Sequence, residues 1–86
     1  MDSYFTKLSD SQLQMVEDEL SNNEVSTNIE LADFFIESGI PVTTALQALI
    51  YRDRYLNWIF KAGHTPIRVG DDALVYEPHT RQFVRF

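Results

Sequence analysis

The chain of 86 residues contains no cysteine, which excludes disulfides and thiolate metal sites. Its three glycines stand alone, so no glycine-rich phosphate loop is present. The longest uncharged run, Ser38 to Tyr51, is interrupted by Gly39 and Pro41 and ends at charged residues, so it is not a membrane span. The first residues lack the basic stretch and apolar run of a secretory signal. We therefore expect one soluble, cytoplasmic domain over residues 1–86.

Basic side chains are scarce in the front half of the chain. Residues 1–39 hold nine acids against Lys7 alone, whereas residues 40–86 hold four acids and six bases, and the formal net charge is −6. This asymmetry disfavours contact with nucleic-acid phosphates and favours solubility or a basic partner. The same acids could equally form ordinary solvated helix faces.

Two capping boxes predict where the first two helices begin. In such a box a Ser or Thr hydroxyl accepts a hydrogen bond from the backbone three residues later, and a Gln or Glu side chain reaches back. Ser9 with Gln12 has this spacing, and so does Thr27 with Glu30. Apolar residues at helical spacing follow both pairs, which predicts two amphipathic helices.

The stretch from Thr44 to Ala62 reads as a third helix with more apolar surface than one face can hold. An ordinary surface helix hides a single stripe against its own core. The excess indicates either a central helix covered on both sides or a surface reserved for another chain. One stripe contains Leu46, Leu49, Ile50, Leu56 and Phe60, and the other contains Ala45, Ala48, Tyr51, Tyr55, Trp58 and Ile59.

After Pro66 the period changes from helical to alternating, which predicts a three-stranded antiparallel meander packed on the helices. The segment 77–80 predicts a type I turn around Pro78. If this turn closes tightly, Tyr76 lies opposite Arg81. The fold class is therefore α+β. We expect three helices over about 9–21, 28–38 and 43–62, followed by strands over about 67–69, 73–77 and 81–86.

No group of residues points to catalysis or to a metal ion. The two histidines, His64 and His79, lie outside any ligand pattern. The Gly70–Asp72 run lacks the alternation of a calcium loop, and turn chemistry explains it. The acids from Glu17 to Glu19 are consecutive, so their carboxylates point around a helix rather than toward one another. We therefore expect no enzyme activity and no cofactor.

The hypothesis that remains is a small regulatory or inhibitor-like accessory protein, of the kind that bacteria and phages often encode. It would bind another protein that has a basic surface, and it could form a homodimer through the third helix. Acidic residues would steer the partner, and aromatic residues with an arginine would anchor it. The acidic face comprises Glu17, Asp18, Glu30, Asp33 and Glu37, and the anchors are Tyr51, Arg52, Tyr55 and Trp58.

These anchors also have a structural interpretation. The three rings could simply pack beneath the meander. Arg52 is harder to explain, because its neighbours on the helix are apolar. It could extend to water, pair with an acid of the second helix, or reach a partner.

A winged-helix DNA-binding protein is the alternative hypothesis. Residues 30–50 would form the helix-turn-helix with Gly39 at the turn, and the third helix would enter the major groove. Arg68, Arg81 and Arg85 on the hairpin would contact phosphates. The first turns of that helix are apolar, however, and the net charge has the wrong sign for counterion release. The sequence therefore disfavours nucleic acid as a partner.

Overall fold

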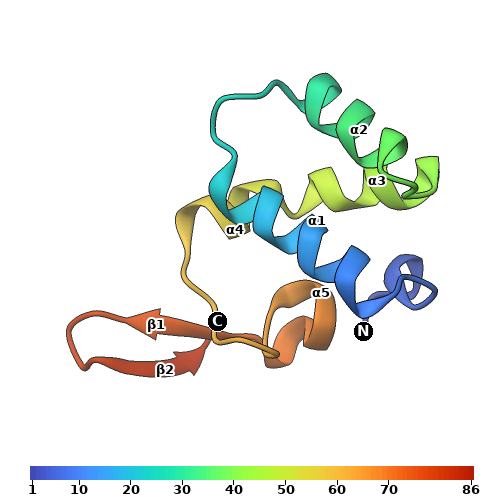
Figure 1. Cartoon of the computed structure of the whole chain (residues 1–86). Coiled ribbons are helices and arrows are strands. Elements are labelled where there is room, and N and C mark those ends of the chain that lie inside the picture. Colours follow the sequence, from blue (N-terminus) through green and yellow to red (C-terminus); the bar gives the residue numbers. More distant parts are fainter.

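The computed structural model describes residues 1–86. Figure 1 shows a helical body from which one β-hairpin projects. The mixed α+β class is right, but the predicted three helices and three-stranded meander are wrong, because the chain has five α helices and a two-stranded antiparallel sheet. The elements are η1 (Ser3–Phe5), α1 (Asp10–Asn22), α2 (Asn28–Glu37), α3 (Val42–Ile50), α4 (Arg52–Asn57), α5 (Pro66–Val69), η2 (Gly70–Asp72), β1 (Leu74–Glu77) and β2 (Gln82–Arg85).

The first two helices begin where the sequence predicts. Ser9 Oγ accepts a hydrogen bond from the Gln12 backbone N–H at 3.1 Å, and the Gln12 side chain accepts one from the Ser9 N–H at 2.9 Å. Thr27 and Glu30 form the same reciprocal pair at the start of α2. Gly39 follows α2 with φ +93°, a left-handed conformation that glycine adopts without strain. These local signals are confirmed.

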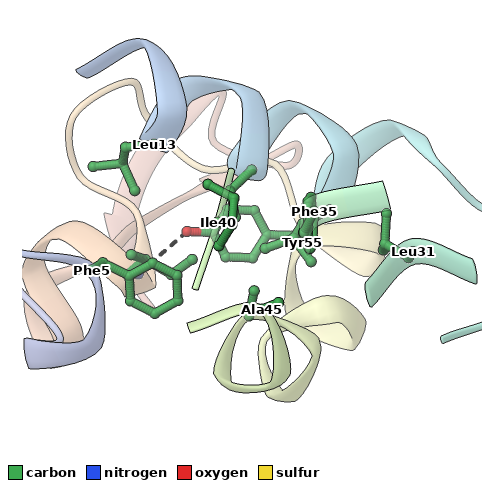
Figure 2. Close-up of a cluster of buried hydrophobic side chains, with 11 residues drawn as sticks. Phe5, Leu13, Leu31, Phe35, Ile40, Ala45 and Tyr55 are labelled. Carbon is green, nitrogen blue, oxygen red and sulfur yellow. Dashed lines mark hydrogen bonds between the residues drawn. The ribbon is translucent and has the colours of Figure 1, made fainter. Parts of the chain in front are cut away.

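The hydrophobic core lies where α1, α3, α4 and η1 meet. Antiparallel α2 and α3 pack against each other, and α1 packs against α4. Figure 2 shows the ring of Tyr55 in the middle of the buried cluster. The cluster consists of Phe5, Leu13, Val16, Leu20, Leu31, Phe35, Ile40, Ala45, Ala48, Tyr55 and Ile67.

The predicted single helix over 43–62 is wrong. The chain forms α3 and α4, which are joined at Tyr51, and helical structure ends at Asn57. Trp58 is already extended, with φ −132° and ψ 145°. Three side chains of this region each form a hydrogen bond to a different part of the chain: Tyr51, Arg52 and Tyr55.

Long-range pairing explains why the helix stops. The Lys61 N–H donates to the Leu74 carbonyl at 2.9 Å, and the Tyr76 N–H donates to the Ile59 carbonyl at 2.8 Å. The segment Ile59–Lys61 thus lies antiparallel beside β1, with an isolated bridge between Phe60 and its partner in β1. Aromatic and β-branched residues suit such an extended edge. The neighbour of β1 on this side therefore comes from the end of the predicted third helix.

The predicted strand over 67–69 is also wrong, because these residues lie in the short helix α5. Pro66 occupies the first turn, where its fixed φ suits a helix and its missing N–H costs nothing. Gly70 follows the helix with φ +59°. Ile67 is fully buried, so α5 supplies one side chain to the core.

The hairpin forms, but its register differs from the prediction. Tyr76 lies opposite Phe83 rather than Arg81, because the loop holds four residues between Glu77 and Gln82. Arg81 takes the left-handed conformation that closes this loop, with φ +56°. The shift is of two residues, so every side chain keeps its predicted face of the sheet.

The hairpin makes the molecule longer than a compact domain of this size. Its dimensions are 40 × 27 × 19 Å and its radius of gyration is 12.8 Å, against about 12 Å expected for 86 residues. In Figure 1 the hairpin and the α2–α3 pair project from opposite ends of the molecule. Every residue of β2 is exposed, so the predicted packing of the whole meander on the helices does not occur.

Candidate functional site

Glu17, predicted to lie on an acidic surface, is buried in a polar network. Its Oε1 accepts from Arg68 Nε at 2.6 Å, and its Oε2 accepts from the Tyr55 hydroxyl at 2.7 Å. The Tyr55 oxygen accepts in turn from the Ile67 N–H at 3.3 Å. Burial, reinforced by the Glu17 carboxylate, raises the pKa of Tyr55, so its phenol remains a donor. The network joins α1, α4 and α5, and Glu17 and Tyr55 are enclosed within it.

Arg52 does none of the three things that the sequence left open. Only 8% of it is exposed. Its guanidinium donates to Asn28 Oδ1 at 2.7 Å and to the carbonyls of Asn23 and Ser26 at 2.8 and 2.6 Å. These acceptors belong to the loop between α1 and α2 and to the first turn of α2. Arg52 therefore holds that loop against α4 and faces no carboxylate.

Tyr51 is half-buried and connects α3 to the start of the chain. Its hydroxyl donates to Asp2 Oδ2 at 2.6 Å, and Gln47 donates to the same oxygen at 3.0 Å. Burial and the Asp2 carboxylate raise the pKa of Tyr51 to about 12. Burial alone would raise the pKa of Asp2, but the hydrogen bonds from Tyr51, the Tyr4 N–H and Gln47 lower it.

Trp58 is the exposed member of the predicted anchor set. Its ring meets the edge of Phe86 at 5.6 Å between centroids, and Phe86 contacts Phe60 at 5.3 Å. This aromatic cluster fixes the hairpin to the body. Trp58 also lines an open groove of about 610 Å³ between α1 and the segment 55–63. The predicted aromatic anchor is thus divided between interior contacts and one surface ring.

The predicted acidic face is likewise divided. Asp18 is exposed on α1, accepts a hydrogen bond from Gln14 at 2.8 Å and lines the groove beside Trp58. The three acids of α2, Glu30, Asp33 and Glu37, are exposed on that helix. They lie three to seven residues apart, so they share one side of α2. We call these three residues the acidic ridge.

Glu30 has a structural task within the acidic ridge. Hydrogen bonds from the Thr27 backbone and hydroxyl lower its pKa, because the carboxylate caps the first turn of α2. Asp33 and Glu37 form no side-chain hydrogen bond or ion pair within the chain. These two carboxylates are therefore free to meet a partner.

Exposed aliphatic side chains line α2 and α3. On α3, Val42, Leu46 and Ile50 recur every four residues and form one stripe. On α2, Ile29 and Ile36 lie seven residues apart and form a second stripe. These side chains are between 37% (Ile36) and 76% (Ile29) exposed. We call the five residues the aliphatic face.

The two helices run antiparallel, so the first turn of each lies beside the last turn of the other. Figure 1 shows α2 and α3 side by side, so Ile29 lies near the end of α3 that carries Ile50, and Ile36 lies near the end that carries Val42. The buried residues of α3 point the other way, into the core, and those of α2 lie on the adjoining side of that helix. Next around α2 from this face come the acids of the acidic ridge, Asp33 first. The aliphatic face thus has an acidic border.

If the predicted third helix were central and covered on both sides, Leu46 and Ile50 would be buried. The structure instead leaves Leu46 and Ile50 uncovered, because α3 turns Ala45 and Ala48 toward the core. Leu46 and Ile50 belong to the first of the two apolar stripes in the sequence, whereas the aromatic residues proposed as anchors lie on the other. Periodicity shows which residues share one side of a helix, but it does not show which side the rest of the chain covers.

The arginines proposed for DNA contact are not gathered on one surface. Arg68 is paired with Glu17 in the interior network. Arg85 pairs with Asp72 at 3.1 Å on the exposed hairpin, and Arg81 lies in the hairpin loop. Figure 1 places the hairpin far from α3, which itself carries no Lys or Arg. No basic surface surrounds the helix that would enter the major groove.

Comparison of the chain with protein-family models, curated proteins and solved structures finds no match. No helix combines the length and the hydropathy that crossing a bilayer requires. No three His, Asp or Glu side chains converge closely enough to hold a metal ion.

Proposed function

We propose that this chain is a non-catalytic protein-binding module whose docking surface is the aliphatic face of α2 and α3. The observation that supports this most is the exposure of five aliphatic side chains on one side of a helical pair. Scattered apolar residues are normal on a protein surface, but a contiguous group of this kind is typical of an interaction site. Covering it would remove apolar area from water, which is the main driving force for association.

The partner that fits this surface is an amphipathic helix with basic residues along its border. Two antiparallel helices present a shallow groove into which a third helix can lay its apolar side. The acidic ridge would then attract Lys or Arg side chains on the flank of that helix. A second copy of the same face fits poorly, because it would bring two acidic ridges together.

Binding of this kind would regulate sterically. A partner helix held on α2 and α3 is not free to pack elsewhere, so the partner loses whatever contact that helix normally makes. This is the inhibitor-like action that the sequence suggested, with the aliphatic face in place of the predicted aromatic residues as its anchor.

A titration with designed peptides tests the proposal. One helical peptide carries Leu on one side and Lys on the other, and a second has Glu in place of Lys. We expect the Leu/Lys peptide to bind in calorimetry and the Leu/Glu peptide to bind at least tenfold more weakly, a difference of about 1.4 kcal/mol or more. A scrambled Leu/Lys peptide without an apolar side should also bind weakly.

Two matched variants locate the binding surface. Ile50→Glu places a charge in the aliphatic face and should weaken binding of the Leu/Lys peptide at least tenfold. Ile59→Glu is the control, because Ile59 is 68% exposed and Ile50 64% but Ile59 lies outside the face. Asp33→Lys with Glu37→Lys should also weaken binding, and Glu30 stays because it caps α2. Equal binding by both isoleucine variants, or no preference for the amphipathic peptide, would overturn the proposal.

A further inference from the structure

The outer edge of β2 carries backbone groups without a partner. The Phe86 N–H donates to the Ala73 carbonyl at 3.0 Å, and Val84 lies opposite Val75. Since antiparallel residues alternate in the direction of their backbone bonds, Phe83 and Arg85 point their N–H and C=O groups away from β1. In Figure 1 no other segment lies along this edge.

This edge lacks most features that keep edge strands from pairing. It has no proline and no bulge, and its exposed side chains include Phe83 and Val84. An exposed apolar edge is a template for a further strand. Its one charge, Arg85, makes only a solvent-exposed ion pair with Asp72, which contributes little free energy.

We propose that this edge pairs with the same edge of a second copy, antiparallel, with a two-fold axis at Val84. Backbone alternation permits pairings centred on Phe83, Val84 or Arg85. Centring on Phe83 places Arg85 opposite Arg81, and centring on Arg85 places the two Arg85 side chains opposite each other. Like charges directly opposite are destabilising. Centring on Val84 instead places each Arg85 opposite Phe83 of the other copy, where a cation can lie over a ring.

The distribution of charge disfavours a second copy at the aliphatic face far more than at this edge. The acids are concentrated in residues 1–39, whereas the hairpin carries Arg81 and Arg85 against Glu77. Figure 1 shows the hairpin at the end of the molecule opposite α2 and α3. Pairing through β2 therefore keeps the two acidic ridges at the far ends of the dimer. Repulsion across that distance is screened by salt, since the Debye length is about 8 Å at physiological ionic strength.

Pairing at β2 would join the two sheets into one. Each copy contributes the extended segment Ile59–Lys61, β1 and β2 in that order. The aliphatic faces remain open at the two ends, so the dimer would present two docking surfaces. Pairing at β2 is independent of what those surfaces bind.

Single cysteines test the pairing, because the natural chain has none. In the proposed register the two copies of residue 84 face each other in a pair without backbone hydrogen bonds, about 4.5 Å apart between Cα atoms, which a disulfide can span. Val84→Cys should therefore form a covalent dimer under mild oxidation. Gln82→Cys is the control, since its two copies would be about 13 Å apart. Equal cross-linking of both variants, or stronger cross-linking of Phe83→Cys or Arg85→Cys, would overturn the proposed register.

Light scattering on the unmodified chain gives an independent test. Its mass should rise toward twice that of one chain as the concentration increases. Phe83→Pro removes the outward-pointing N–H and the ring that contacts Tyr76, but it breaks no backbone hydrogen bond to β1. This variant should therefore remain a monomer and keep the circular dichroism spectrum of the helical body. A natural chain that stays monomeric up to ~1 mM, or a Phe83→Pro variant that still dimerises, would refute the proposal.

Discussion

Replacing Tyr55 by Phe removes one hydroxyl from the network that joins α1, α4 and α5, and leaves the ring in place. The substitution deletes the 2.7 Å hydrogen bond to Glu17, and a bond to a charged group contributes about 1.5–3 kcal/mol. It also takes the acceptor from the buried Ile67 N–H, which costs about 1–3 kcal/mol. That contact is long at 3.3 Å, so the low end applies. We expect a total loss of about 2–4 kcal/mol.

This loss is large for so small a protein. A domain of 86 residues has a free energy of unfolding of about 4–13 kcal/mol. Urea unfolding followed by circular dichroism should show a lower midpoint with an unchanged slope, because the surface exposed on unfolding is the same. The melting temperature should fall by roughly 4–8 °C for each kcal/mol lost.

Tyr76→Phe is the matched control. The Tyr76 ring contacts Phe83 at 5.6 Å, and this contact survives the substitution. Its hydroxyl makes no hydrogen bond within the chain, so the change should stay within about 0.5 kcal/mol. A loss below about 1 kcal/mol for Tyr55→Phe, or equal losses for the two variants, would show that the network contributes far less than its geometry implies.

Three further predictions follow from the other interior contacts. The difference in phenolate absorbance between the natural chain and Tyr51→Phe should titrate near pH 12, because the pKa of Tyr51 is raised. The stability that this raised pKa contributes is complete below about pH 10 and is lost above it. A titration midpoint near pH 10 would contradict this. Asp2→Asn should cost stability at pH 7 and progressively less as pH falls below about 4, since the pKa of Asp2 is lowered in the folded state; an equal cost in urea unfolding at pH 7 and pH 3 would contradict it. Arg52→Lys should speed amide hydrogen exchange in the 23–27 loop, because an ammonium lacks the planar fork that bonds several acceptors; unchanged exchange would show that the loop holds without that fork.

The parts of the fold that the sequence predicted correctly depend on residues close together in the chain. The Ser9 and Thr27 capping boxes each span four residues, and both form with the predicted partners. Gly39 ends α2 because a left-handed residue is needed there. Pro66 and Gly70 are similar local signals for α5, but the alternating pattern of Ile67 to Val69 competes with them and predicts a strand. Short-range signals were therefore reliable where they did not compete.

The errors arose where distant segments decide the conformation. Trp58 to Phe60 fits a helical period, yet hydrogen bonds to β1 hold this stretch extended. Glu17 fits an acidic surface, yet α4 and α5 bring Tyr55 and Arg68 to its two oxygens. Arg52 looks free in sequence, and only the folded loop supplies the carbonyls that it binds. The partners of Glu17 and Arg52 lie more than 20 residues away along the chain. Those of the 58–60 stretch lie somewhat closer.

Three features could be predicted from the residues alone: the α+β class, the positions of α1 and α2, and the surplus of apolar surface in the region of α3 and α4. Each of these depends on composition, caps or periodicity, which act over a few residues. Two further features depend on the folded chain: which apolar stripe is buried and which forms the aliphatic face, and which edge of β1 each neighbour occupies. Those outcomes depend on burial and backbone pairing between segments far apart in the chain, where one arrangement excludes the other. The surface proposed for binding is the one that the rest of the chain leaves uncovered.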